Sequence, residues 1–162
     1  MSRSVLGEFG VVIVEPNAAE RARLLRVLQR APGFDVRGAA ATGTEAIEVA
    51  ASCQPHLVLL RLDLPDLAGY AVTSLLVARH PGLAIVVLAR EGEEAAARLA
   101  GRMGAVGCLT AGSREEAIIE AARSALGTVL TGHRATPRQL AAEAARKAQD
   151  PPEAAVGAAE ER

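Results

Sequence analysis

Five short apolar segments alternate along the chain with five segments of helical hydrophobic spacing, and this alternation restricts the fold more than any other feature. Strand–helix–strand units with short connections cross over with a right hand, which places their strands parallel. We therefore predict an α/β domain in which helices cover both faces of a mainly parallel five-stranded sheet. Both a flavodoxin-like and a Rossmann-like strand order are compatible with the alternation. The expected strands cover residues 11–15, 34–40, 56–62, 83–89 and 105–109, and the expected helices cover residues 18–30, 45–53, 70–80, 92–103 and a segment after Ser113.

Three of the expected helices begin with a residue pair that is typical of helix N-termini. In each pair, a side chain that can accept a backbone hydrogen bond stands three residues before a glutamate. The pairs are Asn17 with Glu20, Thr42 with Glu45, and Ser113 with Glu116. We expect the first residue of each pair to cap its helix.

The turn after the first expected strand argues against a nucleotide or flavin site. It reads Glu-Pro-Asn-Ala-Ala-Glu-Arg over residues 15–21 and contains no glycine. Loops that bind dinucleotides or phosphates need glycines, so that backbone N–H groups can approach the phosphate closely. No cofactor is expected.

Composition excludes several further classes of protein. Cys53 and Cys108 give neither a disulfide framework nor metal-ligand spacing, so a reducing cytoplasm is the expected location. No apolar run approaches the roughly 20 residues of a membrane span. Only three aromatic residues are present, which argues against stacking on single-stranded nucleic acid. The 18 basic and 19 acidic residues nearly balance, so the chain by itself is not expected to bind DNA.

The chain divides into four expected parts. Residues 1–9 form an N-terminal arm, and residues 10–127 form the α/β domain. Residues 128–149 form a linker and a helix without a strong apolar stripe. Residues 150–162 are rich in Ala, Glu and Pro and bury too little apolar surface to fold, so a disordered tail is expected there.

Residues 10–127 resemble the receiver domain of bacterial response regulators. The resemblance rests on the strand Val-Val-Ile-Val-Glu over residues 11–15, on Gln-Pro-His-Leu-Val-Leu-Leu-Arg-Leu-Asp-Leu-Pro-Asp-Leu-Ala-Gly over 54–69, and on Gly-Ala-Val-Gly-Cys-Leu over 104–109. It implies the flavodoxin-like strand order 2-1-3-4-5. Among receivers, the sequence pattern is most similar to that of helix-turn-helix regulators of the NarL/FixJ type.

The resemblance also implies that the family's phosphorylation residues are replaced. Receivers hold Mg²⁺ with a pair of acids after strand one and accept a phosphoryl group on an Asp at the end of strand three. A Thr or Ser after strand four and a Lys after strand five contact the phosphoryl group. Here those positions are Glu15-Pro16, Arg61, Ala89 and Ala111, and the only lysine is Lys147. We therefore expect neither phosphoryl transfer, nor a metal site, nor any other enzyme activity.

Arg61 is the most informative of these replacements. A guanidinium about 4 Å from a divalent ion costs on the order of 8 kcal/mol at an effective dielectric constant near 20, so Arg61 and Mg²⁺ nearly exclude each other. Strands one and three are expected to be neighbours, which would place Glu15 beside Arg61 in a bidentate ion pair. Alternatively, Arg61 extends over the mouth of the site into water. Asp63 is expected to be a loop acid rather than a displaced phosphoacceptor, and His56 lies at the opposite end of its strand.

Signalling through protein contacts is the expected function, with a protein partner or a second copy of the chain. In the resembled family the output face consists of helix four, strand five and helix five, and here that face would contain Glu94, Arg98, Arg102, Cys108, Arg114, Ile118 and Arg123. Two other functions remain open. The chain could be the regulatory half of a DNA-binding regulator whose helix-turn-helix lies elsewhere, or a sensor that binds a small anion through Arg61.

Overall fold

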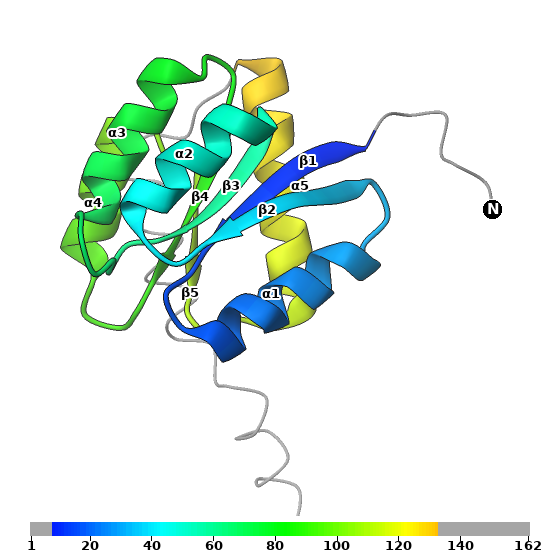
Figure 1. Cartoon of the computed structure of the whole chain (residues 1–162), viewed down its shortest axis with the longest axis horizontal. Coiled ribbons are helices and arrows are strands. Elements are labelled where there is room, and N and C mark those ends of the chain that lie inside the picture. The colour runs from blue at the N-terminus through cyan, green and yellow to red at the C-terminus, as the bar shows by residue number, and fades with distance from the viewer. Residues whose placement is uncertain (1–7, 133–162) are drawn as a thin grey trace, which may run out of the picture.

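The computed structural model describes residues 8–132, which form a five-stranded parallel sheet between two layers of helices (Figure 1). The strands are β1 (Phe9–Val14), β2 (Phe34–Ala40), β3 (Leu57–Arg61), β4 (Ala84–Ala89) and β5 (Gly107–Thr110). The helices are α1 (Ala18–Arg30), α2 (Gly43–Cys53), α3 (Gly69–Arg79), α4 (Glu94–Met103) and α5 (Glu115–Thr131). The strand order β2-β1-β3-β4-β5 confirms the flavodoxin-like arrangement and excludes the Rossmann-like one.

The apolar runs form the inner strands of the sheet. Every residue of β3 and β4 is buried, as expected for strands that are covered by helices on both faces. β2 lies at one edge and is partly exposed, with Asp35 and Arg37 facing solvent. β1 pairs with both β2 and β3, and Val14 stands opposite Leu60 in the register with β3. The residues that follow β1 and β3 therefore leave the sheet side by side.

Two separate apolar cores hold the helices against the sheet. Helices α2, α3 and α4 cover one face, and helices α1 and α5 cover the other (Figure 1). The α1–α5 core includes Val11, Ile13, Leu24, Leu28, Leu57, Leu59, Ile118 and Ala122. Within residues 8–132, no helix has the length and apolar character needed to cross a membrane.

Two of the three expected helix caps are confirmed. The Asn17 side chain accepts a hydrogen bond from the Glu20 N–H at 2.9 Å, and the Thr42 hydroxyl oxygen accepts one from the Glu45 N–H at 3.1 Å. These bonds satisfy backbone donors that have no partner within the first turn of a helix.

The expected cap at Ser113 is wrong. Helix α5 has Arg114 at its N-cap position, without a side-chain cap bond. The Ser113 hydroxyl instead donates a hydrogen bond to the Thr110 carbonyl, and the Ser113 N–H donates to the same oxygen. Ser113 therefore closes the turn after β5, and the helix begins beyond it.

Helix α5 also continues past the expected domain boundary at residue 127. Gly127 lies inside the helix, which ends at Thr131 with Gly132 in a left-handed conformation. Residues 128–131 are therefore helical and do not belong to a linker. The N-terminal arm before residue 8 and the rest of the expected linker, helix and tail lie outside the described residues.

Candidate functional site

The carboxyl ends of the strands bring together, at one edge of the sheet, the positions that the resemblance assigns to phosphorylation. Glu15 and Pro16 follow β1, Arg61 is the last residue of β3, and Ala89 is the last residue of β4. Ala111 follows β5, and its N–H donates a hydrogen bond to the Ala89 carbonyl at 2.8 Å. The positions that the sequence pattern assigns to one site are thus neighbours in space.

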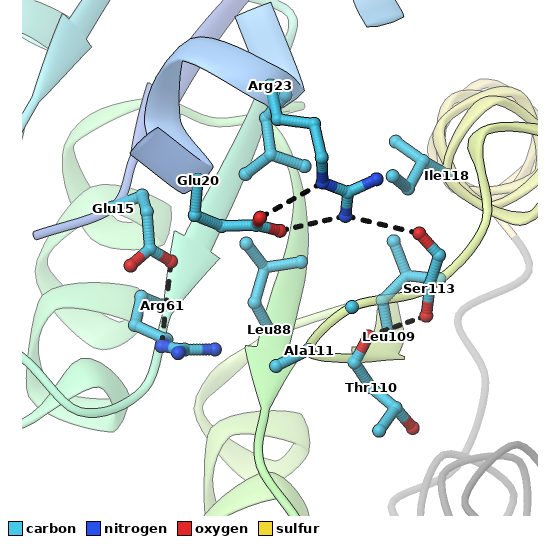
Figure 2. Close-up of a pocket in the computed structure, with 12 residues that line it drawn as sticks. Glu15, Glu20, Arg23, Arg61, Leu88, Leu109, Thr110, Ala111, Ser113 and Ile118 are labelled. Carbon is cyan, nitrogen blue, oxygen red and sulfur yellow. Dashed lines mark hydrogen bonds and ion pairs between the residues drawn. The ribbon is translucent and has the colours of Figure 1, made fainter. Parts of the chain in front are cut away.

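Glu15 and Arg61 form a buried ion pair at the centre of this edge (Figure 2). The Arg61 Nε lies 3.5 Å from the Glu15 Oε2, and the side chains are 6% and 1% exposed. The expected contact is confirmed, but the expected bidentate geometry is wrong, because no hydrogen bond joins the two side chains. Extension of Arg61 into water is also wrong. The other Glu15 oxygen, Oε1, accepts the Asn17 N–H at 3.1 Å.

The two paired atoms are not hydrogen-bonded to any residue in the described part of the chain. Both Arg61 Nε and Glu15 Oε2 are buried, and neither meets the geometry of a hydrogen bond with a partner. Their attraction is therefore coulombic. The N–H groups of a guanidinium point in fixed directions. The main-chain position of Arg61 in β3 therefore limits which of these groups can point at Glu15.

A second, more exposed ion pair connects helix α1 with the loop after β5 (Figure 2). Arg23 contacts both carboxylate oxygens of Glu20, at 2.9 and 2.8 Å, and also donates to the Ser113 carbonyl at 3.2 Å. The hydrogen bond from Arg23 is the main reason why the pKa of Glu20 is lowered, and the charge of Arg61 lowers that pKa further. Sequence reasoning missed this bridge. Its only local signal was the three-residue spacing of Glu20 and Arg23.

Glu15 and Arg61 line two hollows, a small cavity and a larger open cleft. A small cavity of about 10 Å³ is lined by Arg61, Leu88 and the loop residues 110–113. A larger open cleft of about 370 Å³ has Arg61 and Arg90 among its lining residues. The small cavity has room for a group of the size of one water molecule, whereas the cleft can hold a small metabolite.

The residues of the site do not fit the Mg²⁺ that the resemblance implies. Glu15 is the only buried carboxylate there, and the positive charge of Arg61 is 3.5 Å from it. Asp63 is 65% exposed and lies 3.9 Å from the Arg90 guanidinium. No group of three or more His, Cys, Asp or Glu side chains within residues 8–132 is arranged to hold a metal ion. A hard divalent cation requires several oxygen ligands, and a guanidinium repels it.

Asp66 ties the loop between β3 and α3 to the start of helix α2. Its carboxylate accepts hydrogen bonds from the Gly43 N–H at 2.7 Å, the Thr44 N–H at 2.9 Å and the Thr44 hydroxyl at 2.7 Å. The hydroxyl bond contributes most to lowering the pKa of Asp66 from 3.8 to about 2, and the two N–H bonds add to the effect. A negative charge is also favourable at the N-terminus of a helix.

The lowered pKa of Asp66 predicts a specific pH dependence of stability. Because the folded state holds this proton less tightly than the unfolded state, the stabilising contribution is complete above about pH 4 and is lost as the pH falls toward about 2. We expect the variant Asp66→Asn to lose less free energy of unfolding than the wild type across this range. Urea denaturation at several pH values measures this difference. Equal pH slopes for the two proteins would contradict the predicted role of Asp66.

The structure corrects the expected interaction face. Cys108 and Ile118 are each 1% exposed and belong to the two apolar cores, so they are not part of a surface. The Arg123 guanidinium is 6.0 Å from the ring centre of Phe34 and donates to the Pro32 carbonyl, toward the β2 side of the molecule. The positions that remain at the surface are Glu94, which is half-buried, and Arg98, Arg102, Arg114 and Arg123, which are exposed.

The remaining candidate residues lie where the sequence predicted. His56 is at the amino end of β3, where its Nδ1 accepts the Gly10 N–H at 2.9 Å. Asp63 is a loop acid beyond the end of β3. Cys53 is half-buried and its thiol donates to the Arg37 carbonyl at 3.4 Å, and Cys108 is buried.

Comparisons with known proteins agree with this fold. The family model of the response regulator receiver domain matches residues 11–123. Response regulator GacA of Pseudomonas aeruginosa is 27% identical over 141 residues, which cover 87% of this chain and 64% of GacA. Protein-glutamate methylesterase/protein-glutamine glutaminase 6 of Anaeromyxobacter dehalogenans is 35% identical over 80 residues, which cover 49% of this chain and 23% of that protein. The crystal structure of a LuxR-family two-component response regulator from Aurantimonas sp. SI85-9A1 superimposes with a TM-score of 0.71 at 24% identity, covering 89% of this chain and all of that one.

Proposed function

The chain belongs to the response regulator receiver family, and we propose that it is a pseudo-receiver: a non-catalytic module that signals through protein–protein contacts without being phosphorylated. The observation that carries this proposal is the buried contact of Arg61 with Glu15, 3.5 Å between Nε and Oε2. Arg61 stands where the family carries the phosphoacceptor. A guanidinium is not a phosphoryl acceptor, and its positive charge repels Mg²⁺.

The positions around Arg61 support the same proposal. Ala89 offers no hydroxyl to a phosphoryl oxygen, and Ala111 offers no ammonium group. Phosphoryl transfer depends on positioned positive charge and hydrogen-bond donors around the reacting oxygens. Pro16 likewise removes the second carboxylate that would share a metal ion with Glu15.

Two of the loops at this edge are held by side chains of the protein itself. Asp66 binds the N-terminus of α2, and Arg23 binds the loop after β5. Contacts of this kind favour one arrangement of the loops in the absence of any modification. We therefore propose that the domain adopts its partner-binding state constitutively.

We further propose transcriptional regulation in the cytoplasm as the process that the domain serves. GacA and the LuxR-family structure are both named response regulators. The chain spans 64% of the length of GacA, so the alternative that it is the regulatory half of a DNA-binding regulator belongs to the same proposal. With a net charge of −1, the chain itself is proposed to bind a protein partner or a second copy, and neither nucleic acid nor membrane.

Arg61→Asp alone is not expected to create a phosphorylation site. The variant still lacks the hydroxyl, the ammonium group and the second acid that Ala89, Ala111 and Pro16 would have to supply. Intact-mass spectrometry after incubation with acetyl phosphate and Mg²⁺ should show no added phosphoryl group on the wild type or on this variant. Addition of one phosphoryl group to either protein would overturn the proposal.

The matched positive control restores the complete set of side chains. The fourfold variant Pro16→Asp, Arg61→Asp, Ala89→Thr and Ala111→Lys is expected to gain one phosphoryl group under the same conditions. An unrelated receiver domain that retains all of these side chains serves as the control for the reagents.

A further inference from the structure

We propose that the cleft at the carboxyl edge of the sheet binds a small oxyanion, a carboxylate or a phosphate, between Arg61 and Arg90. Such binding goes beyond the proposed function. Oxyanion binding does not depend on whether the domain is phosphorylated. It requires only a positively charged side chain whose N–H groups have no other acceptor.

Arg61 has donors to offer. Its Nε faces Glu15, and within residues 8–132 neither terminal nitrogen of the guanidinium has a hydrogen-bond acceptor. The side chain is nevertheless 94% buried, since only 6% of it is exposed. Figure 2 shows the guanidinium extending past Glu15 toward the space beside Leu88 and Ala111. Only the Nε of this guanidinium is both buried and without a hydrogen-bond partner. The two terminal nitrogens are therefore open to a ligand, and an oxyanion can accept two N–H groups of a guanidinium in parallel.

The volumes of the two hollows beside Arg61 limit the size of the ligand. The cavity of about 10 Å³ admits one water-sized group, so any larger ligand must use the cleft of about 370 Å³. That cleft is lined by Arg61 and Arg90, by the acids Glu15 and Asp63, and by Pro16, Asn17, Leu64 and Pro65. Its volume suits a small metabolite that carries one oxyanion group and an apolar part that contacts the leucine and prolines.

The charges of the cleft also favour an anion over a cation. The carboxylate of Glu15 is occupied inside the protein, by the Asn17 N–H and by Arg61. Asp63 is the only other acid that lines the cleft, and it approaches Arg90 only to 3.9 Å with both side chains more than half exposed. A pair of this kind is weak. An oxyanion can therefore replace Asp63 as the partner of Arg90 while it also binds the terminal nitrogens of Arg61.

The test is an NMR titration of the full chain with inorganic phosphate and, separately, with acetate, at constant ionic strength. The amide signals of residues 61–64 and 90 and the Nε–Hε signal of Arg61 report binding. We expect saturable shifts at these positions with at least one of the two anions. Saturation with phosphate alone assigns a phosphate ligand, and saturation with acetate alone assigns a carboxylate ligand. Strictly linear shifts with both anions up to about 50 mM would overturn the proposal.

Charge-changing variants show whether the binding occurs in this cleft. Arg90→Ala should weaken it severalfold, and Asp63→Asn should tighten it about threefold by removing a nearby negative charge. The double variant Glu15→Gln/Arg61→Gln removes the guanidinium without leaving a lone buried charge, and it should abolish binding. Arg79→Ala and Asp35→Asn change the same charges at exposed positions outside the cleft and should leave the affinity unchanged. Equal affinities in Arg90→Ala, Asp63→Asn and the wild type would overturn the proposal.

Discussion

Replacing Arg61 with methionine is expected to lower the free energy of unfolding by about 3–5 kcal/mol. Methionine keeps the unbranched apolar stem of the side chain but removes the charge that lies 3.5 Å from Glu15. The carboxylate of Glu15, 1% exposed, would then be buried without a counter-ion. Breaking a buried pair on one side is far more costly than removing both partners, because the remaining charge has lost its solvation without compensation. Urea denaturation measures the loss.

Two variants separate this effect from the loss of packing. Adding Glu15→Gln to Arg61→Met removes the lone charge, while the glutamine oxygen can still accept the Asn17 N–H. The double variant should therefore recover most of the lost free energy. Arg23→Met breaks an ion pair whose side chains are 31% and 28% exposed, and this loss should stay below about 1 kcal/mol. A loss at Arg61 no larger than the loss at Arg23 would contradict the importance of the buried pair.

Gly69→Ala is expected to destabilise the fold by about 3 kcal/mol. A Cβ atom at this position would lie 2.5 Å from the Leu62 Cα and 2.9 Å from the Arg61 carbonyl oxygen. Both are main-chain atoms of the segment that leaves β3, and the Gly69 N–H donates to the Leu62 carbonyl at 2.9 Å, so the two segments cannot separate freely. The displaced backbone carries Arg61, and the NMR signals of Arg61 should therefore shift as well.

Gly127→Ala is the matched control for the same chemical change. A Cβ atom at Gly127 meets nothing within 4 Å, and the residue lies inside helix α5. Alanine should therefore raise the free energy of unfolding by about 0.5–1 kcal/mol, because glycine loses more backbone entropy on folding. Thermal or urea denaturation of both variants checks the opposite signs. Wild-type stability of Gly69→Ala would show that the segment after β3 relaxes easily.

Local patterns in the sequence were sufficient to predict the elements of the fold but not all of their ends. The continuous apolar runs of β3 and β4 predicted strands buried on both faces, and the alternation of elements predicted parallel pairing. The strand order followed only from the resemblance, because alternation alone allowed two orders. Gly127 suggested an end of the helix, yet glycine costs only about 1 kcal/mol inside a helix. The packing of Ala125 and Leu126 against the sheet holds α5 together through that position.

The candidate site was predictable where strand neighbours determine it. Glu15 and Arg61 follow adjacent parallel strands, so their contact could be deduced, although the number of atoms in contact could not. The hydrogen bond from Arg23 to Ser113 joins residues 90 positions apart, and no local sequence pattern predicts it. The interaction face expected from the family included Cys108, whose side chain instead lies in the core that helices α2, α3 and α4 share with the sheet.

The long separation between β1 and α5 has a consequence for synthesis on the ribosome. β1 leaves the ribosome first, and Val11 and Ile13 belong to a core that Ile118 and Ala122 of α5 complete. At about 5–20 residues per second, the nascent chain exposes this apolar face of β1 for several seconds before α5 is made. During that interval the growing protein presents a ready binding surface to chaperones, and it becomes resistant to aggregation only when α5 is released.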